Sequence, residues 1–99
     1  MIGLSKRRRR KLKAKPFAAD WRRVLTDRMP YYSKLSAAEQ AELEGHIQVL
    51  VSEKYFEGCA GLVVTEEMKV LIAGQAALLL LGRDADYFPW MRTALIYPN

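Results

Sequence analysis

The chain has 99 residues, of which 51% are hydrophobic, and its formal net charge at pH 7 is +5. This length can bury one modest hydrophobic core, so these residues can hold one domain at most. The longest apolar run covers residues 70–81 and is interrupted by Gly74 and Gln75. A membrane-spanning helix needs about 20 apolar residues, so this run predicts a buried helix and not a membrane span.

The positive charge is concentrated near the N-terminus, where eight of the ten residues from Lys6 to Lys15 are Lys or Arg. Without residues 1–15, eight basic side chains stand against eleven acidic ones, so the net charge of the remainder is about −3. A run of like charges repels itself and has few apolar side chains to bury. We therefore expect residues 1–15 to be a disordered basic tail and residues 16–99 to be a single folded region.

The N-terminal sequence also bears on the compartment. Pro16 and Phe17 lead into Asp20 and Arg22, instead of the apolar segment that follows the charged start of a signal peptide. A single cysteine, Cys59, excludes an internal disulfide and agrees with a reducing environment. We expect a cytoplasmic protein.

The first predicted helix follows Pro16, and Pro30 ends it. Its apolar side chains recur at helical intervals on one face: Trp21, Val24, Leu25 and Met29. The second predicted helix opens at Ser36, with Glu39 three residues on, the spacing of a capping box. Its apolar stripe is formed by Leu43, Ile47, Leu50 and Val51, opposite Gln40, Glu44 and Gln48.

The third predicted helix is capped by Thr65 and ends at Gly82. Residues 62–64 before it and residues 94–97 after it have the composition of short strands. The predicted fold class is mainly α, with about three helices and one or two short edge strands.

Two of these features indicate an incomplete fold. A helix that is apolar on nearly every side must be covered on more than one face, and an isolated pair of strands is marginally stable in water. We expect more protein to follow Asn99, completing an α+β domain, and we expect the isolated chain to be loosely folded or to associate with itself.

No catalytic, cofactor-binding or metal-binding residue can be assigned. A zinc site needs three or four His, Cys or carboxylate ligands, and His46 has no other His or Cys at helical spacing. We interpret His46 as a surface or boundary side chain and Cys59 as a small residue in a tight turn. The chain has no His-Glu-x-x-His, no Gly-x-Ser-x-Gly and no phosphate-binding glycine-rich loop.

Other residues have competing structural and functional interpretations. Glu66 and Glu67 suit the positive end of a helix better than acid–base chemistry. Aromatic side chains near Pro30 and Pro89 favour packing at the edge of the domain over a substrate groove: Tyr31, Tyr32, Tyr87, Phe88 and Trp90. The basic run between Lys6 and Lys15 is either a solvated tail or a site for nucleic acid or an anionic membrane surface. No aromatic residue is interleaved with it, so it does not predict sequence-specific recognition.

Five short motifs are distributed along the chain: Phe56-Glu57-Gly58-Cys59, Gly61-Leu62, Thr65-Glu66-Glu67-Met68, Leu78 to Gly82, and Leu95 to Pro98. Together they resemble the Mlc titration factor A family of bacterial peptidases. The resemblance covers about residues 16–98, the part that would precede the family's zinc-binding helix.

The resemblance implies a cytosolic zinc-dependent metallopeptidase with aminopeptidase activity on peptide substrates. The best-known member binds the glucose-responsive repressor Mlc and thereby affects the sugar phosphotransferase system. In the complete family protein the zinc ligands and the general base lie on the His-Glu-x-x-His helix, so none of them can be placed on these 99 residues. We expect the chain itself to be inactive and to bind no zinc. The alternative is a non-enzymatic binding module for a protein partner or, through the basic run, for nucleic acid.

Overall fold

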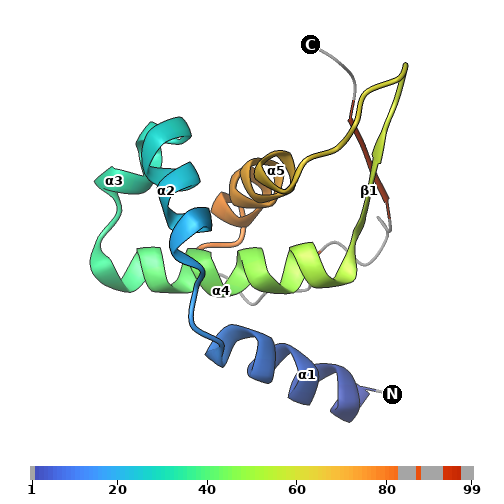
Figure 1. Ribbon diagram of the computed structural model, residues 1–99. Coiled ribbons are helices and arrows are strands. Elements are labelled where there is room, and N and C mark those ends of the chain that lie inside the picture. The colour runs from blue at the N-terminus through green and yellow to red at the C-terminus, as the bar shows by residue number, and fades with distance from the viewer. Residues whose placement is uncertain (1, 83–86, 88–92, 97–99) are drawn as a thin grey trace.

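The described part of the chain is mainly helical, as predicted, and is shown in Figure 1. The computed structural model describes residues 2–82, 87 and 93–96. These residues form five helices and two short strands, in the order α1 (Ile2–Ala14), α2 (Ala19–Arg28), α3 (Pro30–Lys34), α4 (Ala37–Glu53), β1 (Tyr55–Gly58), α5 (Glu66–Leu78) and β2 (Thr93–Ile96). The sequence predicted three of these helices.

Helix α4 is the central element, and its start confirms the predicted capping box. Ser36 Oγ accepts a hydrogen bond from the Glu39 backbone N–H at 3.1 Å, and Glu39 Oε1 accepts one from the Ser36 N–H at 2.9 Å. Each side chain satisfies a backbone donor that the first turn of a helix leaves free. Helix α1 runs along one side of α4, while α5 packs against another side and α2 packs on α5 (Figure 1).

The core lies where α2, α4 and α5 meet. Leu25, Leu43, Ile47 and Val70 are fully buried, so the apolar faces predicted for these helices do point inward. Gly74 on α5 permits the close approach, because a Cβ there would lie 3.1 Å from Met29 Sδ and 3.2 Å from Leu25 Cδ2. The helix that is apolar on most sides is thus covered by α2 on one side and α4 on another.

Helix α1 differs from the disordered tail expected for residues 1–15. Leu12 packs against the core, and the guanidinium of Arg9 holds the Glu53 carboxylate at the far end of α4 with contacts of 2.7 and 2.8 Å. The apolar and acidic partners that offset the charge repulsion therefore lie on α4, far away in the sequence. Charge density alone predicted disorder because it contains no information about such partners.

Pro30 both ends one helix and begins the next. Helix α2 stops at Arg28, and Pro30 occupies the first turn of the short helix α3, where its missing N–H costs no hydrogen bond. The predicted stop at Pro30 is confirmed, whereas α3 was not anticipated.

The strand predicted at residues 62–64 is wrong, because the first strand is β1 at Tyr55–Gly58. It pairs in parallel with β2, with Tyr55 opposite Thr93 and Gly58 opposite Ile96. After β1 the chain reverses through a tight turn closed by a hydrogen bond from the Leu62 N–H to the Cys59 carbonyl at 3.1 Å. A Cβ at Gly58 would lie 2.0 Å from the Leu62 carbonyl oxygen, so only glycine fits there. Residues 62–64 therefore form the link to Thr65 and not part of the sheet.

Helix α5 is capped as predicted but ends earlier than predicted. Thr65 Oγ1 accepts a hydrogen bond from the Met68 N–H at 3.2 Å. The regular helix ends at Leu78, and residues 79–82 continue as tight turns up to Gly82, which has a φ of +72°. No helix in the described residues is both long enough and apolar enough to cross a membrane. The strand predicted at residues 94–97 is confirmed as β2, apart from Tyr97, which lies outside the described residues.

Candidate functional site

A buried histidine, His46, lies at the centre of a hydrogen-bond network that links separate parts of the fold. His46 lies in the middle of α4 and is only 3% exposed. Its Nδ1 is 2.7 Å from the Tyr87 hydroxyl, and its Nε2 is 3.2 Å from Glu42 Oε2, one turn earlier on the same helix. Glu42 Oε2 also accepts a hydrogen bond from the Gly82 N–H at 2.9 Å. The network thus joins α4 to the end of the α5 segment and to Tyr87.

The surroundings keep His46 neutral and fix its tautomer. Burial lowers the pKa of His46, and the nearby Lys13 charge acts in the same direction, while Glu42 opposes them. The pKa of Glu42 is lowered chiefly by the hydrogen bond from the Gly82 N–H, so Glu42 is a carboxylate. A carboxylate can only accept, so the network assigns the proton to Nε2, and Nδ1 accepts from the Tyr87 hydroxyl. This corrects the expectation of a surface or boundary histidine.

Tyr87 connects the histidine network to helix α1. Its ring is buried, it stands edge-on to the His46 ring, and its backbone has an unusual positive φ of 56°. Arg9 Cζ lies 4.8 Å and Lys13 Nζ lies 5.4 Å from the centre of the ring. Cations over an aromatic face are attracted to its negative charge density, so Tyr87 is held both by His46 and by α1.

These residues do not fit a zinc ion. Within residues 2–82, 87 and 93–96, no three His, Cys, Asp or Glu side chains gather closely enough to hold a metal. Both ring nitrogens of His46 are already engaged in hydrogen bonds. Cys59 lies in the turn after β1 as a free, partly exposed thiol, as expected for a small residue in a tight turn. A structural zinc site uses four such ligands and a catalytic one at least three, so the described side chains do not assemble a zinc site.

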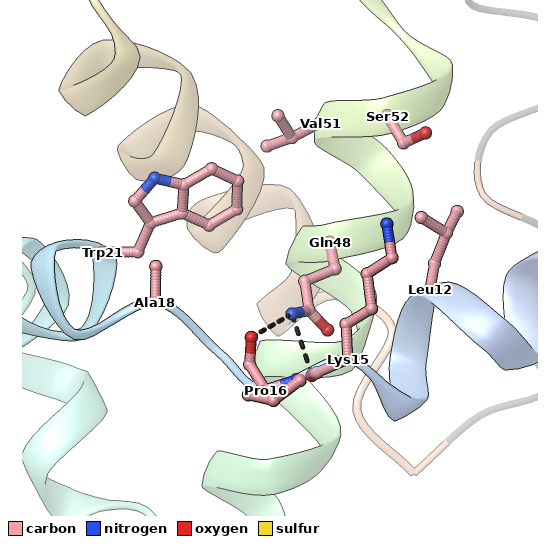
Figure 2. Close-up of a pocket in the computed structure, with 8 residues that line it drawn as sticks. All are labelled: Leu12, Lys15, Pro16, Ala18, Trp21, Gln48, Val51 and Ser52. Carbon is pink, nitrogen blue, oxygen red and sulfur yellow. Dashed lines mark hydrogen bonds between the residues drawn. The ribbon is translucent and has the colours of Figure 1, made fainter.

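A pocket of about 260 Å³ lies between the end of α1 and helices α2 and α4 (Figure 2). Its apolar lining comes from Leu12, Pro16, Ala18, Trp21 and Val51. The Gln48 amide at its floor already donates to the backbone carbonyls of Lys15 and Pro16, at 3.1 and 3.3 Å. The pocket is smaller than most ligand sites, and the Gln48 side chain in its lining is already hydrogen-bonded to the backbone. These two hydrogen bonds from Gln48 join the α1–α2 connection to α4.

The acidic pair at the start of α5 is structural. Glu66 Oε2 accepts a hydrogen bond from the Trp21 indole N–H at 2.9 Å, and Glu67 Oε2 is 2.6 Å from Arg28 Nη1. Both carboxylates thus tie α2 to the first turn of α5, where negative charge is also favoured by the helix dipole. The interpretation of this pair as structural and not acid–base is supported by both contacts.

The aromatic residues near Pro30 and Pro89 do not share one environment in the structure. Tyr32 is buried and donates its hydroxyl hydrogen bond to Glu44, which also binds Arg22, whereas Tyr87 binds His46. Tyr31 is 62% exposed. Phe88 and Trp90 lie outside the described residues. For Tyr32 and Tyr87 the packing interpretation is correct, because both rings are buried.

Sequence reasoning missed three parts of this region. Glu42 could have been found from its spacing, because positions 42 and 46 share one face of a helix. The contact of Tyr87 with His46 and that of Arg9 with Glu53 had no local signal, since their partners are distant in the sequence.

Comparison with known proteins places the chain in a family. Residues 4–99 match the model described as glucose-regulated metallo-peptidase M90, in the N-terminal region of that family. The chain therefore belongs to the M90 metallopeptidase family, and its resemblance to the Mlc titration factor A peptidases is confirmed.

One relative is an uncharacterized protein of Synechocystis sp., 36% identical over 92 residues. The aligned part covers 93% of this chain and 34% of the relative, so the chain spans about a third of that protein's length. No solved structure matches the chain.

Proposed function

We propose that residues 1–99 form the N-terminal helical part of a zinc-dependent peptidase whose metal site lies in sequence beyond them. The observation that carries this proposal is the family match over residues 4–99, combined with a described structure that holds no group of potential metal ligands. The limited share of the longer Synechocystis relative that the chain covers supports the same division.

In this proposal the helical part supplies support and not chemistry. Helices α2, α4 and α5 share one core, and β1 and β2 form a two-stranded parallel sheet beside it. Such a small sheet gains stability from further strands or from cover on its faces. We propose that the catalytic part of the complete protein packs against this sheet and positions its zinc-binding helix there.

The test begins with the gene. The locus is sequenced beyond the codon for Asn99, and a continuation containing His-Glu-x-x-His is expected. The 99-residue chain and the extended protein are then purified, and their zinc content is measured together with the hydrolysis of aminoacyl p-nitroanilides. We expect zinc and chelator-sensitive activity in the extended protein alone. A continuation without the motif, or an extended protein that binds no zinc, would refute the proposal and favour a non-enzymatic binding module.

The family resemblance also supports a cytoplasmic protein that contacts a transcriptional repressor of the Mlc type. This partner is tested by titrating a purified repressor of that type into the extended protein and into the 99-residue chain by isothermal calorimetry. Binding to the extended protein is expected, and binding to the short chain as well would locate the partner surface on the helical part. Absence of binding to either would remove the repressor from the proposal without affecting the peptidase activity.

A further inference from the structure

Helix α1 has two faces with different roles. Arg9, Leu12 and Lys13 face the body of the protein, where they contact Glu53, the core and Tyr87. Arg7 and Arg10 lie three residues apart, so they share the opposite face of the helix, and Lys11 extends it. These three residues are exposed. We call Arg7, Arg10 and Lys11 the outer basic face.

No described carboxylate neutralises the outer basic face. Of the exposed cations around it, Arg8 lies 3.9 Å from Glu53 with its side chain 66% exposed. Within the described residues, no ion pair involves Lys6, Arg7, Arg10, Lys11 or Lys15. The inner face of the same helix is held by Glu53 and by the Tyr87 ring. The positive charges therefore lie on a helix that is packed against α4, and not on the disordered tail that the sequence predicted.

We propose that the outer basic face binds the phosphate backbone of double-stranded nucleic acid. Phosphate contacts from Lys and Arg release counterions, which gives affinity without sequence preference. The three cations of this face lie within about 6 Å along the helix axis, so they can contact about three phosphates of a duplex, one each. The remainder of the chain is net negative, so α1 is the side that a polyanion approaches.

The structure favours a duplex over the other anionic partners. Helices that bind membrane surfaces bury an apolar face in the lipid, but between Lys6 and Lys13 the one apolar side chain, Leu12, is packed against the core. Single strands are held by stacking on aromatic side chains, and residues 6–15 contain none. The outer basic face is expected to contact the phosphates of the duplex and not its base edges, so binding should not depend on base sequence.

The experiment measures binding of the full chain to a fluorescein-labelled DNA duplex of about 20 base pairs by anisotropy, between about 50 and 200 mM salt. The test variant is Arg7→Gln, Arg10→Gln and Lys11→Gln. The control variant is Arg23→Gln, Lys34→Gln and Lys69→Gln, which removes the same charge from α2, α3 and α5. Glutamine has nearly the helix propensity of lysine and arginine, and far-UV circular dichroism checks that α1 is retained in both.

The expected result is an affinity that falls steeply as salt rises. In the test variant the log–log slope should become shallower by about 0.9 for each phosphate that the helix no longer binds. The control variant should retain the slope of the parent chain. Equal reductions of the slope in both variants would show a general charge effect and overturn the proposal.

Parallel measurements separate a duplex from a lipid surface. They use vesicles of phosphatidylcholine with and without phosphatidylserine, at the same salt concentrations as the duplex titrations. The chain is expected to bind the duplex more tightly than either kind of vesicle. Preferential binding to the anionic vesicles, or no binding to the duplex, would also overturn the proposal.

Discussion

At the scale of single residues, His46 makes stability depend on pH. Burial lowers the folded-state pKa of His46 below its ordinary value of about 6.5. As the pH falls through that value, the unfolded chain takes up a proton before the folded chain does, so the free energy of unfolding decreases. Charged and titratable groups that face His46 are Glu42, Tyr87 and Lys13.

We therefore expect the free energy of unfolding in urea to fall between about pH 7 and pH 5. The variant His46→Gln should be less stable at pH 7, because it disturbs a buried network, but should show little pH dependence in this range. The pKa values of Glu42 and Glu53 are lowered, so the stability they contribute is lost only at more acidic pH. An unchanged slope in His46→Gln would assign the effect to another group.

Replacement by alanine is expected to affect stability differently at two helix glycines, Gly74 and Gly45. In Gly74→Ala the new methyl group meets Met29 and Leu25 in the core, whereas in Gly45→Ala it meets the Lys13 side chain at 3.2 Å. Alanine favours a helix by about 1 kcal/mol over glycine. Overpacking a core costs about 1–3 kcal/mol, so Gly74→Ala should be destabilising overall.

Gly45→Ala should be close to neutral or stabilising, because Lys13 is flexible and α1 can shift on the surface of α4. Thermal unfolding of both variants provides the comparison. Equal destabilisation by the two substitutions would contradict the packing difference described for the two glycines.

At the scale of elements, the docking of α1 depends on Glu53. This carboxylate is mostly buried and accepts both contacts from Arg9, which lower its pKa. In Glu53→Gln the charge is lost, at a cost of about 1–2 kcal/mol for a partly exposed charged pair. Hydrogen exchange should show faster exchange of the amides of α1, with little change in α5.

The control is Glu57→Gln, which removes the same charge from an exposed position on β1. It should leave the exchange of α1 unchanged. Since the folded-state pKa of Glu53 is depressed, the docking of α1 should also weaken as the pH falls below the ordinary pKa of a carboxyl group, about 4.5. Protection of α1 that survives Glu53→Gln would show that Leu12 and Tyr87 are sufficient to hold it.

The elements that were predictable from sequence are those with local signals. Ser36 and Glu39 mark the start of α4, and Thr65 marks the start of α5, because each capping contact spans only three residues. Helix α1 and strand β1 could not be placed in this way. Helix α1 is held in place by Glu53, and the strand at Tyr55 pairs with a partner at Thr93.

The same distinction applies to the candidate site. Ligand requirements led to the prediction that His46 has no metal role. Glu42 was missed, although its spacing from His46 places both residues on one face of a helix. The burial of His46 was missed, because it depends on Tyr87 and on helix α1 covering that ring. Pairwise contacts over such separations have no periodic pattern in the sequence.

At the scale of the whole molecule, the exposed apolar side chains should govern association. Tyr55 on β1 is 76% exposed and Val63 in the following link is 77% exposed. Exposed apolar groups beside a small sheet favour pairing between chains. We expect the 99-residue chain to self-associate reversibly in sedimentation velocity experiments, and Tyr55→Thr with Val63→Thr to shift it toward monomer.

Threonine keeps the strand preference of position 55, and position 63 lies in the exposed link outside the sheet, so the free energy of unfolding should change little. Tyr31→Thr is the control, because Tyr31 is comparably exposed but lies on α3. An equal shift toward monomer in the control would mean that association does not involve the region of β1.

The parallel pairing of β1 with β2 also sets an order of events during synthesis of the chain. Parallel strands need a crossover, and here α5 and the residues after it stand between the two partners. When β1 leaves the ribosome its partner has not been made, whereas α2, α3 and α4 can already meet through short connections. The sheet can therefore form only after β2 has been made, and until then the edge of β1 is open to capture by a chaperone or by a neighbouring chain.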